Sequence, residues 1–445
     1  MMNWNQLIST RRLGKGPETD EADLYKRTQF QRDYDRIIFS SPFRRMQNKT
    51  QVFPLPGSIF VHNRLTHSLE VASVGRSLGS MLSEKLIQAG EKNPLVYELG
   101  AVVSAACLAH DMGNPPFGHA GEEAISNYFT EGNGKGLEAL VGPEEWSDFV
   151  YFDGNANALR LLTHQFQGRR PGGFALTYTM LASIVKYPYE SAGVSKSKFG
   201  FFQSEKQLYS DIAQELGLIR LTDQPLAFVR HPLVFLVEAA DDICYQIMDL
   251  EDAHKLKILD FETTKDLFLN FYDLQDEKGI RDQIEKTFRA VSDRNEQIAY
   301  LRAGVINKLV NECIRVFNEN QAAILNGSFQ TPLIKGVGAS SKTAMAKIGP
   351  ISVEKIYRDR SVVEIEMAGY QILGTLLDEF IQAVLRPETG LSRRLLSLIP
   401  RQFRGEHQSN YEKILSVIDF VSGMTDLYAL DLYRKIKGIN LPVIG

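Results

Sequence analysis

Apolar residues recur at intervals of three and four along most of the chain, a pattern typical of helices that bury one face. The clearest case is Ser68–Ala89, where the repeat stops at a glycine. Strand signals are weak and short, and Gln51–Phe53 and Lys198–Phe202 carry the best of them. The pattern therefore predicts an all-α protein with at most a small β-hairpin. The other predicted helices are Leu95–His110, Pro232–Glu251, Glu296–Leu325 and Val353–Leu385.

Three stretches rich in Gly, Ser and Pro are expected to be loops, at 131–143, 190–198 and 335–349. The first two lie within the region that carries the candidate chemistry, so we place no domain boundary in them. We expect three parts of the chain to be distinguishable. They are an N-terminal basic arm at 1–49, a catalytic core at 50–260 and a C-terminal helical region at 261–445, packed with that core.

The 445 residues carry a formal net charge of −4, which argues against a general nucleic-acid coat but allows a local basic patch at 24–51. Cys107, Cys244 and Cys313 are widely spaced in apolar surroundings. They indicate a reducing compartment rather than a disulfide scaffold or a zinc-finger array. With no signal peptide and no apolar run long enough for a membrane span, we expect a cytoplasmic protein without a membrane partner.

The first candidate for chemistry is the pair His110-Asp111, which closes the apolar run 101–109 just before Gly113-Asn114-Pro115-Pro116 stops the helix. An imidazole and a carboxylate at one helix end are a usable pair for a divalent metal, although such a dipeptide also arises by chance. His67 lies at the start of another predicted helix, where a capping or surface role is the alternative.

Acidic residues also interrupt the apolar helix predicted at 232–251. Asp241, Tyr245 and Asp249 lie at i, i+4 and i+8 and so share one helix face. Burying two carboxylates and a phenol is costly unless something binds them, and the alternative is that this face is exposed. Two histidines and two aspartates without a thiolate suit Mn²⁺, Mg²⁺, Fe or Co better than a structural zinc. A metal of this kind can polarise a phosphoryl oxygen.

A second histidine–carboxylate pair follows nine residues after His110. If a helix begins near His119, then Glu122 three residues later lies on the same face. An imidazole oriented by a carboxylate is a common means of proton transfer near neutral pH. The competing role for Glu122 is a favourable interaction with the helix dipole.

These residues and their surroundings resemble the bacterial deoxyguanosine triphosphate triphosphohydrolases (dGTPases) of the HD-domain phosphohydrolase superfamily. The matches extend from about residue 25 to 430, nearly the whole chain. The strings that carry the resemblance are Arg27–Ser40, Phe43–Phe53, Asn63–Ser68, Glu238–Tyr245 and Phe420–Tyr428.

The resemblance implies hydrolysis of a deoxynucleoside triphosphate (dNTP), with dGTP as the leading substrate, to the deoxynucleoside and tripolyphosphate. It implies one divalent metal per active site, Mn²⁺ or Mg²⁺ in the first place and Co²⁺ or Fe²⁺ as alternatives. His119 and Glu122 would be the catalytic pair, and whether His119 acts as an acid or helps to activate water stays open. The implied metal ligands are His67, His110, Asp111 and Asp241.

The resemblance also implies substrate contacts. Gln51, Tyr245 and Asp249 match positions that bind the sugar 3′-hydroxyl. The implied phosphate-binding side chain of the metal region is Arg64, and two further segments contribute Lys186, Tyr187 and Lys198. Taken alone, either lysine would be read as a solvated surface charge.

One segment departs from the family pattern. Residues 155–160 read Asn-Ala-Asn-Ala-Leu-Arg where Asn-Ala-Gln-Gly-Phe-Arg is expected, and the family places this segment at the active site. The resemblance therefore leaves base selectivity open. We expect His62, His164 and His231 to be structural or core histidines rather than catalytic ones.

Two other functions remain compatible with the residues. One is an HD-type nucleotidase or phosphodiesterase that cleaves a different phosphate bond. The other is a nucleotide- or nucleic-acid-binding regulator with a vestigial site. The joint presence of all the expected metal ligands and of the catalytic pair argues against this second function. Family members form homo-oligomers, some of them hexamers, and some respond to single-stranded DNA or a dNTP effector. The local basic patch at 24–51, most of it in the N-terminal arm, is our candidate for such binding.

Overall fold

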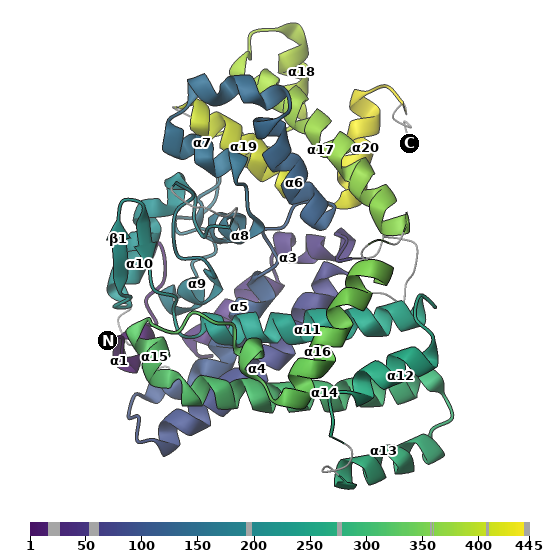
Figure 1. Ribbon diagram of the computed structural model, residues 1–445. Helices are drawn as coiled ribbons and strands as arrows, with labels where there is room; N and C mark the ends of the chain where they lie inside the picture. Colours follow the sequence, from purple (N-terminus) through teal and green to yellow (C-terminus); the bar gives the residue numbers. More distant parts are fainter. Residues whose placement is uncertain are drawn as a thin grey trace.

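Helices α4 (Arg64–Gln88) and α5 (Leu99–Ala109) lie side by side at the centre of the fold (Figure 1). The computed structural model describes residues 1–16, 27–52, 62–192, 198–273, 278–356, 358, 360–405 and 409–439. α4 begins after Asn63, whose side chain accepts a hydrogen bond from the backbone N–H of Thr66 in a reciprocal capping box. α5 is apolar and almost entirely buried, which is why its sequence shows no polar face.

Glycines let these two helices pack closely in antiparallel directions. A Cβ on Gly79 would lie 2.6 Å from the carbonyl oxygen of Leu99, at the start of α5. A Cβ on Gly75 would lie 2.4 Å from Cys107 Sγ, near the end of α5. Larger residues at either position would force the helices apart. This register brings the first turn of α4 beside the residues that follow α5.

The remaining elements surround this pair. The N-terminal half of the chain contributes α1 (Trp4–Leu7), α2 (Gln29–Ile38), α3 (Ser41–Arg45), α6 (Gly118–Thr130), α7 (Pro143–Val150), α8 (Gly154–Thr163), α9 (Tyr178–Ile184), α10 (Lys206–Glu215), β1 (Arg220–Asp223) and β2 (Leu226–Phe228). The C-terminal half contributes α11 (Val234–Lys255), α12 (Phe261–Leu269), α13 (Lys278–Ala290), α14 (Arg294–Glu319), α15 (Gln321–Asn326), α16 (Ala339–Ile351), α17 (Arg360–Leu385), α18 (Gly390–Leu398), α19 (Asn410–Ser422) and α20 (Asp426–Ile436). Short 3-10 turns occur at Met46–Asn48, Pro94–Glu98, Asn133–Leu140, Gln203–Glu205, Leu333–Gly336 and Arg401–Phe403, and a π-helical turn at Ser352–Ile356.

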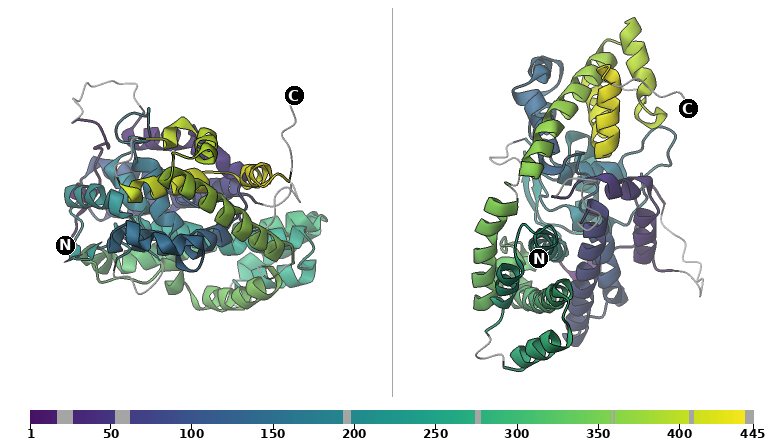
Figure 2. Two further views of the ribbon diagram at one scale, coloured as in Figure 1. Left: turned by 90° about the horizontal axis from the view of Figure 1, so that it is seen from above. Right: turned by 90° about the vertical axis from the view of Figure 1, so that its right-hand side faces the viewer.

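The buried side chains form two hydrophobic clusters. The larger one holds α2, α4, α5, α9, α11 and α14 together, and the smaller one joins α6 and α7 to α17 and α19. Figure 1 shows the second group above the first, and the right-hand view of Figure 2 shows the same arrangement from the side, with α13 at the end farthest from α18. Each cluster draws on distant parts of the sequence. Packing therefore does not divide the chain at 49/50 or 260/261, and that division stays a prediction.

The prediction of an all-α fold is confirmed. In the described part of the chain, the one sheet is the antiparallel hairpin of β1 and β2, in which Arg220 lies opposite Phe228. The predicted strand signals lie elsewhere: Thr50, next to the first, and Phe201, within the second, take part only in isolated bridges, with Asn63 and Glu190. β1 escaped prediction because all four of its residues are exposed and show no alternation.

The predicted loop at 335–349 is wrong, because α16 occupies most of it. Its Gly and Ser content suggested a loop, but Ser341, Ala344 and Ile348 form a buried stripe at helical spacing. The predicted loop at 131–143 contains a 3-10 turn, and part of the one at 190–198 lies outside the described residues. None of the helices in the ranges given above has the length and apolar character needed to cross a membrane.

Candidate active site

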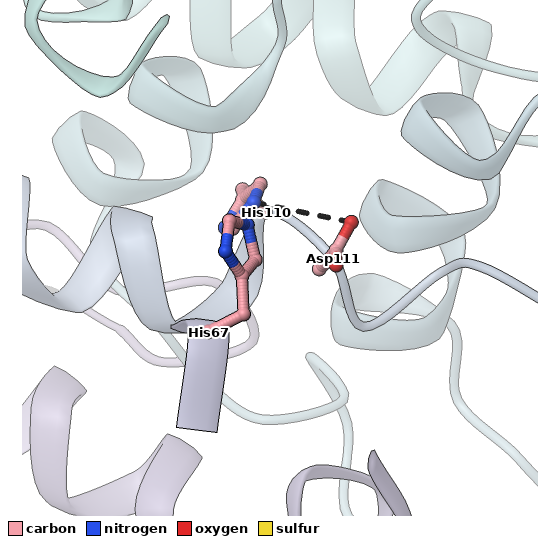
Figure 3. Close-up of side chains that lie close together, drawn as sticks. All are labelled: His67, His110 and Asp111. Atoms are coloured by element: carbon pink, nitrogen blue, oxygen red, sulfur yellow. Dashed lines mark ion pairs between the residues drawn. The ribbon is translucent and has the colours of Figure 1, made fainter. Parts of the chain in front are cut away.

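The first turn of α4 meets the end of α5 at a cluster of two imidazoles and a carboxylate (Figure 3). Ligand atoms of His67, His110 and Asp111 all lie within 4.8 Å of one another. Asp241 on α11 approaches the same point, with its Oδ1 atom 3.1 Å from His67 Nε2 and 3.5 Å from His110 Nε2. The four residues predicted as metal ligands therefore lie together, drawn from three segments of the chain.

Hydrogen bonds from outside the cluster orient its donor atoms. His110 Nδ1 lies 2.6 Å from the carbonyl oxygen of Cys107, which leaves Nε2 directed at the cluster. This buried Nε2 atom makes no hydrogen bond of good geometry in the described part of the chain, and Asp241 Oδ1 faces it at 3.5 Å. Asp111 is held by Arg64, whose Nη1 atom donates to Oδ2 across 2.7 Å, and by the amide of Asn114, which donates to Oδ1. A buried nitrogen without a hydrogen bond of good geometry and an oriented carboxylate fit a metal site.

Charges within the cluster favour ionised carboxylates. Burial alone would raise the pKa of Asp111, but Arg64 and the two histidines outweigh burial and lower it. The same competition holds the pKa of Asp241 well below its ordinary value, because His110 and His67 face it. In return the two aspartates raise the pKa of His110 to about 9 against the effect of burial. Carboxylates in this state are ready to bind a cation.

The predicted catalytic pair forms at the start of α6. His119 Nδ1 lies 3.1 Å from Glu122 Oε2, and the His119 side chain is 75% exposed whereas that of Glu122 is 10% exposed. The other Glu122 oxygen accepts a hydrogen bond of 2.7 Å from the backbone N–H of Gly154. The hydrogen bond to Glu122 raises the pKa of His119, and His119 and Lys198 lower that of Glu122 against its burial. The carboxylate thus orients and charges an accessible imidazole.

Both groups open onto one cavity of about 490 Å³. His110, Asp111 and Asp241 line it near the buried His67, and His119 and Glu122 line it as well. Its walls combine cationic, acidic and apolar side chains from the core helices and from α17. The other lining residues used below are Thr50, Gln51, Arg64, Asn114, Phe117, Gly118, Asn155, Lys186, Tyr187, Lys198, Glu238, Asp242, Tyr245, Val362, Ile365 and Glu366.

The chain is similar to two known domain families and to several known proteins along nearly its whole length. Residues 64–148 match the HD domain family, and residues 336–435 match the phosphohydrolase-associated domain. A deoxyguanosinetriphosphate triphosphohydrolase-like protein of Synechocystis is 40% identical over 99% of this chain and 100% of its own length. One of Pseudomonas aeruginosa is 39% identical with the same coverage, and the deoxyguanosinetriphosphate triphosphohydrolase of Yersinia enterocolitica is 32% identical over 98% of this chain and 99% of its own.

This chain belongs to the deoxyguanosinetriphosphate triphosphohydrolase-like family of HD-domain proteins. Membership in this family makes it a hydrolase. The HD match covers His67, His110, Asp111, His119 and Glu122, and Asp241 joins them from outside the matched residues. The phosphohydrolase-associated match includes α17, which contributes Val362, Ile365 and Glu366 to the cavity.

The substrate contacts expected for this triphosphohydrolase-like protein are distributed unevenly. Gln51, Arg64, Lys186, Tyr187, Lys198 and Tyr245 line the cavity. Asp249 does not line it and is buried one turn beyond Tyr245 on α11. The Oε1 atom of Gln51 is buried without a hydrogen-bond partner among residues the structure describes. The roles of all seven residues stay predictions.

The two lysines of this HD protein line the cavity and face acidic side chains. Lys186 Nζ lies 3.1 Å from Glu238 Oε1, and Lys198 Nζ lies 3.4 Å from Asp153 Oδ2 and 3.8 Å from Glu122 Oε2. Acidic neighbours raise the pKa of both lysines against partial burial, so each is a cation at neutral pH. Burial and nearby acids also raise the pKa of Asp242 to about 7.

Sequence reasoning did not single out several residues of the site. Asn114 holds a proposed metal ligand, and Glu238 partners Lys186. Phe117, immediately before α6, has a φ of 65°, a left-handed conformation that is uncommon for a bulky residue. The sequence signal that could have marked Phe117 is its place between two prolines and a glycine, Gly118. In the structure Gly118 has a φ of 64°. Glu238 lies in a segment that carries the resemblance, but no local signal indicated its contact with Lys186, which lies 52 residues away in the sequence.

The three histidines expected to be structural, His62, His164 and His231, do not line the cavity. His231 is fully buried, its Nε2 lies 3.1 Å from the carbonyl oxygen of Leu7, and burial lowers its pKa to about 4. His62 is flanked by Asp252 and Glu70, and His164 follows α8, where its ring lies 4.8 Å from that of Phe166. The departing segment 155–160 forms part of α8 and contributes Asn155 to the cavity.

Proposed function

We propose that this chain is a dNTP triphosphohydrolase that converts dGTP and water into deoxyguanosine and tripolyphosphate. One observation carries the proposal: the metal-type cluster, the His119–Glu122 pair and several cationic side chains line a single cavity. Hydrolysis at the α-phosphate of a triphosphate calls for these three elements together. The printed names of the Synechocystis and Yersinia relatives support the substrate class and the preference for dGTP.

The residues fit a divalent metal ion. His67, His110, Asp111 and Asp241 would hold it, since two imidazole nitrogens and two carboxylates converge and His110 Nε2 makes no hydrogen bond of good geometry among the described atoms. We propose Mn²⁺ or Mg²⁺, with Co²⁺ or Fe²⁺ as alternatives, because the donor set contains nitrogen and oxygen but no sulfur. When bound, such an ion polarises a phosphoryl oxygen and favours attack by water at phosphorus.

His119 would supply the proton that the leaving group needs. Cleavage between the α-phosphorus and the 5′-oxygen leaves an alkoxide on the deoxynucleoside, and Nε2 is the ring nitrogen of His119 that does not face Glu122. Because Glu122 raises the pKa of His119, the imidazolium persists closer to neutral pH and can protonate the 5′-oxygen. Glu122 keeps its position through the hydrogen bond from Gly154.

Cationic and polar side chains would bind the rest of the substrate. Arg64, Lys186 and Lys198 line the cavity and would balance the charge of the triphosphate. Gln51, Tyr245 and Asp249 are the proposed contacts of the sugar 3′-hydroxyl. The unpartnered oxygen of Gln51 supports its place in this set, whereas Asp249 lies outside the cavity lining and would act from behind Tyr245.

Product analysis with purified protein, Mn²⁺ and each of the four dNTPs tests this function. Deoxynucleoside with intact tripolyphosphate is expected, and dGTP is expected to react fastest. Monophosphate with pyrophosphate would instead identify an HD enzyme that cleaves another phosphate bond. If no dNTP reacts, even in mixtures or with single-stranded DNA added, the regulator with a vestigial site becomes the better interpretation.

The proposal extends to assembly and location. We propose a cytoplasmic homo-oligomer, hexameric as in some family members, that responds to single-stranded DNA or a dNTP effector. The local basic patch at 24–51 is the candidate for such binding. Not all of its cations are free to bind an anion, because Arg27 pairs with Asp35 and Lys49 is buried, while Arg44 is exposed. Binding of DNA there should weaken with added salt, and salt-independent binding would contradict this assignment.

A further inference from the structure

Asp426, the first residue of α20, accepts hydrogen bonds from two segments of the active site. Its Oδ2 atom accepts from the backbone N–H of Thr50 at 2.8 Å and from Thr50 Oγ1 at 2.6 Å. Its Oδ1 atom accepts from the backbone N–H of Phe117 at 3.0 Å. The residue is 7% exposed, and all three contacts place a donor against an acceptor. One buried carboxylate therefore links residues 50 and 117.

Each linked residue precedes a proposed functional side chain. Thr50 is followed by Gln51, the proposed sugar contact, and Phe117 by the first turn of α6, which carries His119. Phe117 and Gly118 both have positive φ, and for Phe117 this conformation is costly. Such a conformation persists only where the surroundings hold it. The hydrogen bond to Asp426 is one part of that support.

A second buried tie joins the same three segments. Lys49 is 3% exposed, and its Nζ donates to the carbonyl oxygen of Asn114 at 2.5 Å and to that of Ser422 at 2.8 Å. Asn114 in turn donates to Asp111. The end of α19 and the start of α20 are thus bonded both to the segment before Gln51 and to the turn between Asp111 and His119.

Asp426 does not itself line the cavity described above. It acts on two residues that do line the cavity, Thr50 and Phe117, by accepting hydrogen bonds from their backbone N–H groups, and not by contact with the substrate. We propose that Asp426 is a positioning residue that fixes Gln51 and His119 relative to each other, so that the C-terminal region completes the active site. This inference rests on the proposed function, because it concerns the rate of that reaction.

The variant Asp426→Asn tests the inference with little change in volume. An amide replaces one accepting oxygen by an NH₂ group, so at least one of the N–H donors of Thr50 and Phe117 loses its acceptor. We expect kcat for dGTP, counted per bound Mn²⁺ ion, to fall at least tenfold and KM to rise. The matched control is Asp431→Asn on the same helix, where the carboxylate is 52% exposed and pairs only with Lys435 among described residues. Its kcat and KM should stay within twofold of wild type.

The split between kcat, KM and bound metal separates positioning from stability. If Asp426 merely stabilises the fold, activity falls in step with the amount of bound Mn²⁺, while kcat per site and KM keep their wild-type values. That result, or an unchanged Asp426→Asn enzyme, overturns the inference. Wild-type protein that hydrolyses no dNTP would instead remove the proposed function and this inference together.

A milder variant covers the case in which Asp426→Asn does not fold. Thr50→Val removes only the hydroxyl that donates to Asp426 Oδ2 and keeps the backbone N–H bond. We expect kcat per bound Mn²⁺ to fall about threefold or more, in line with the net value of one hydrogen bond. Unchanged kcat and KM in Thr50→Val would overturn the inference.

Discussion

Arg64 and Asp111 form a buried ion pair, with Nη1 of the guanidinium 2.7 Å from Oδ2 of the carboxylate and side-chain exposures of 4% and 12%. The resemblance to dGTPases assigned Arg64 to substrate phosphate. In the structure the same side chain lines the cavity and also neutralises a proposed metal ligand. In the proposed function, the substrate, the metal and Arg64 would therefore be electrostatically linked at one carboxylate.

Arg64→Gln is expected to destabilise the metal-free protein. Removing the guanidinium leaves Asp111 as a buried carboxylate with less compensation, a change that typically costs about 3–5 kcal/mol. A bound cation restores part of that compensation. In thermal unfolding, the variant should melt below wild type in a chelator, and added Mn²⁺ should raise its melting temperature more than that of wild type. Equal melting temperatures in the chelator would contradict this role.

Asp241→Ala and His119→Ala are expected to fail for different reasons. Asp241 approaches both histidines of the cluster, so its loss should abolish metal binding and turnover together. His119 contacts Glu122 outside the cluster, so His119→Ala should retain the metal and lose turnover. Metal content per protomer, measured alongside dGTP hydrolysis, separates the two. Equal loss of metal in both variants would mean that His119 is wrongly assigned.

His62 is expected to make stability depend on alkaline pH. Its ring lies 2.8 Å from Asp252 and 3.1 Å from Glu70, and these acids raise its pKa to about 10 although burial opposes them. Because the folded state holds this proton more tightly than the unfolded state, the stabilisation is complete below pH ~6.5 and is lost as pH rises through about 10.

Denaturant unfolding of wild type and His62→Gln at several pH values measures this effect. Between pH ~6.5 and 10 the free energy of unfolding of wild type should fall relative to the variant, by at most about 1.4 kcal/mol per pH unit. The difference between the proteins isolates His62 from other groups that titrate in the same range. Parallel curves across this window would show that the ring gains nothing from its acidic neighbours.

Gly369→Ala is expected to disturb the entry to α6. A Cβ at Gly369 on α17 would lie 2.8 Å from Phe117 Cβ, so the helix or Phe117 must shift. We expect a loss of stability of about 1–3 kcal/mol and a lower kcat for dGTP. Gly374→Ala on the same helix is the matched control, because a Cβ there meets nothing within 4 Å. It should be neutral or stabilising by up to about 1 kcal/mol. Similar behaviour of both variants would rule out the contact with Phe117 as the cause.

The sequence was most informative where the signal was local. The apolar periodicity around α4 predicts this helix well because one buried stripe defines it, and the long apolar run of α11 does the same for a helix that is buried on most sides. By contrast, α16 and the β1–β2 hairpin were misplaced, since Gly and Ser content outweighed a short apolar stripe in the first and exposed residues hid the second. Local composition is a weak guide where tertiary packing decides the structure.

For the candidate site, the resemblance located residues but not their partners. His119 and Glu122 are three residues apart, so helical spacing alone predicted their contact. The contacts of Lys186 with Glu238 and of Phe117 with Asp426 join distant segments, and nothing near either residue indicates them. Asp249 shares a helix face with Asp241 by spacing, yet the walls of the cavity end before it.

The bond between Thr50 and Asp426 spans 376 positions of the chain. During synthesis the helices that carry the proposed metal ligands emerge from the ribosome long before α20 does. A chain that ended before residue 422 would contain every one of those ligands yet lack both ties to Thr50 and Lys49. The site would then reach its proposed geometry only after residues 422–426 have been made and have packed against these segments.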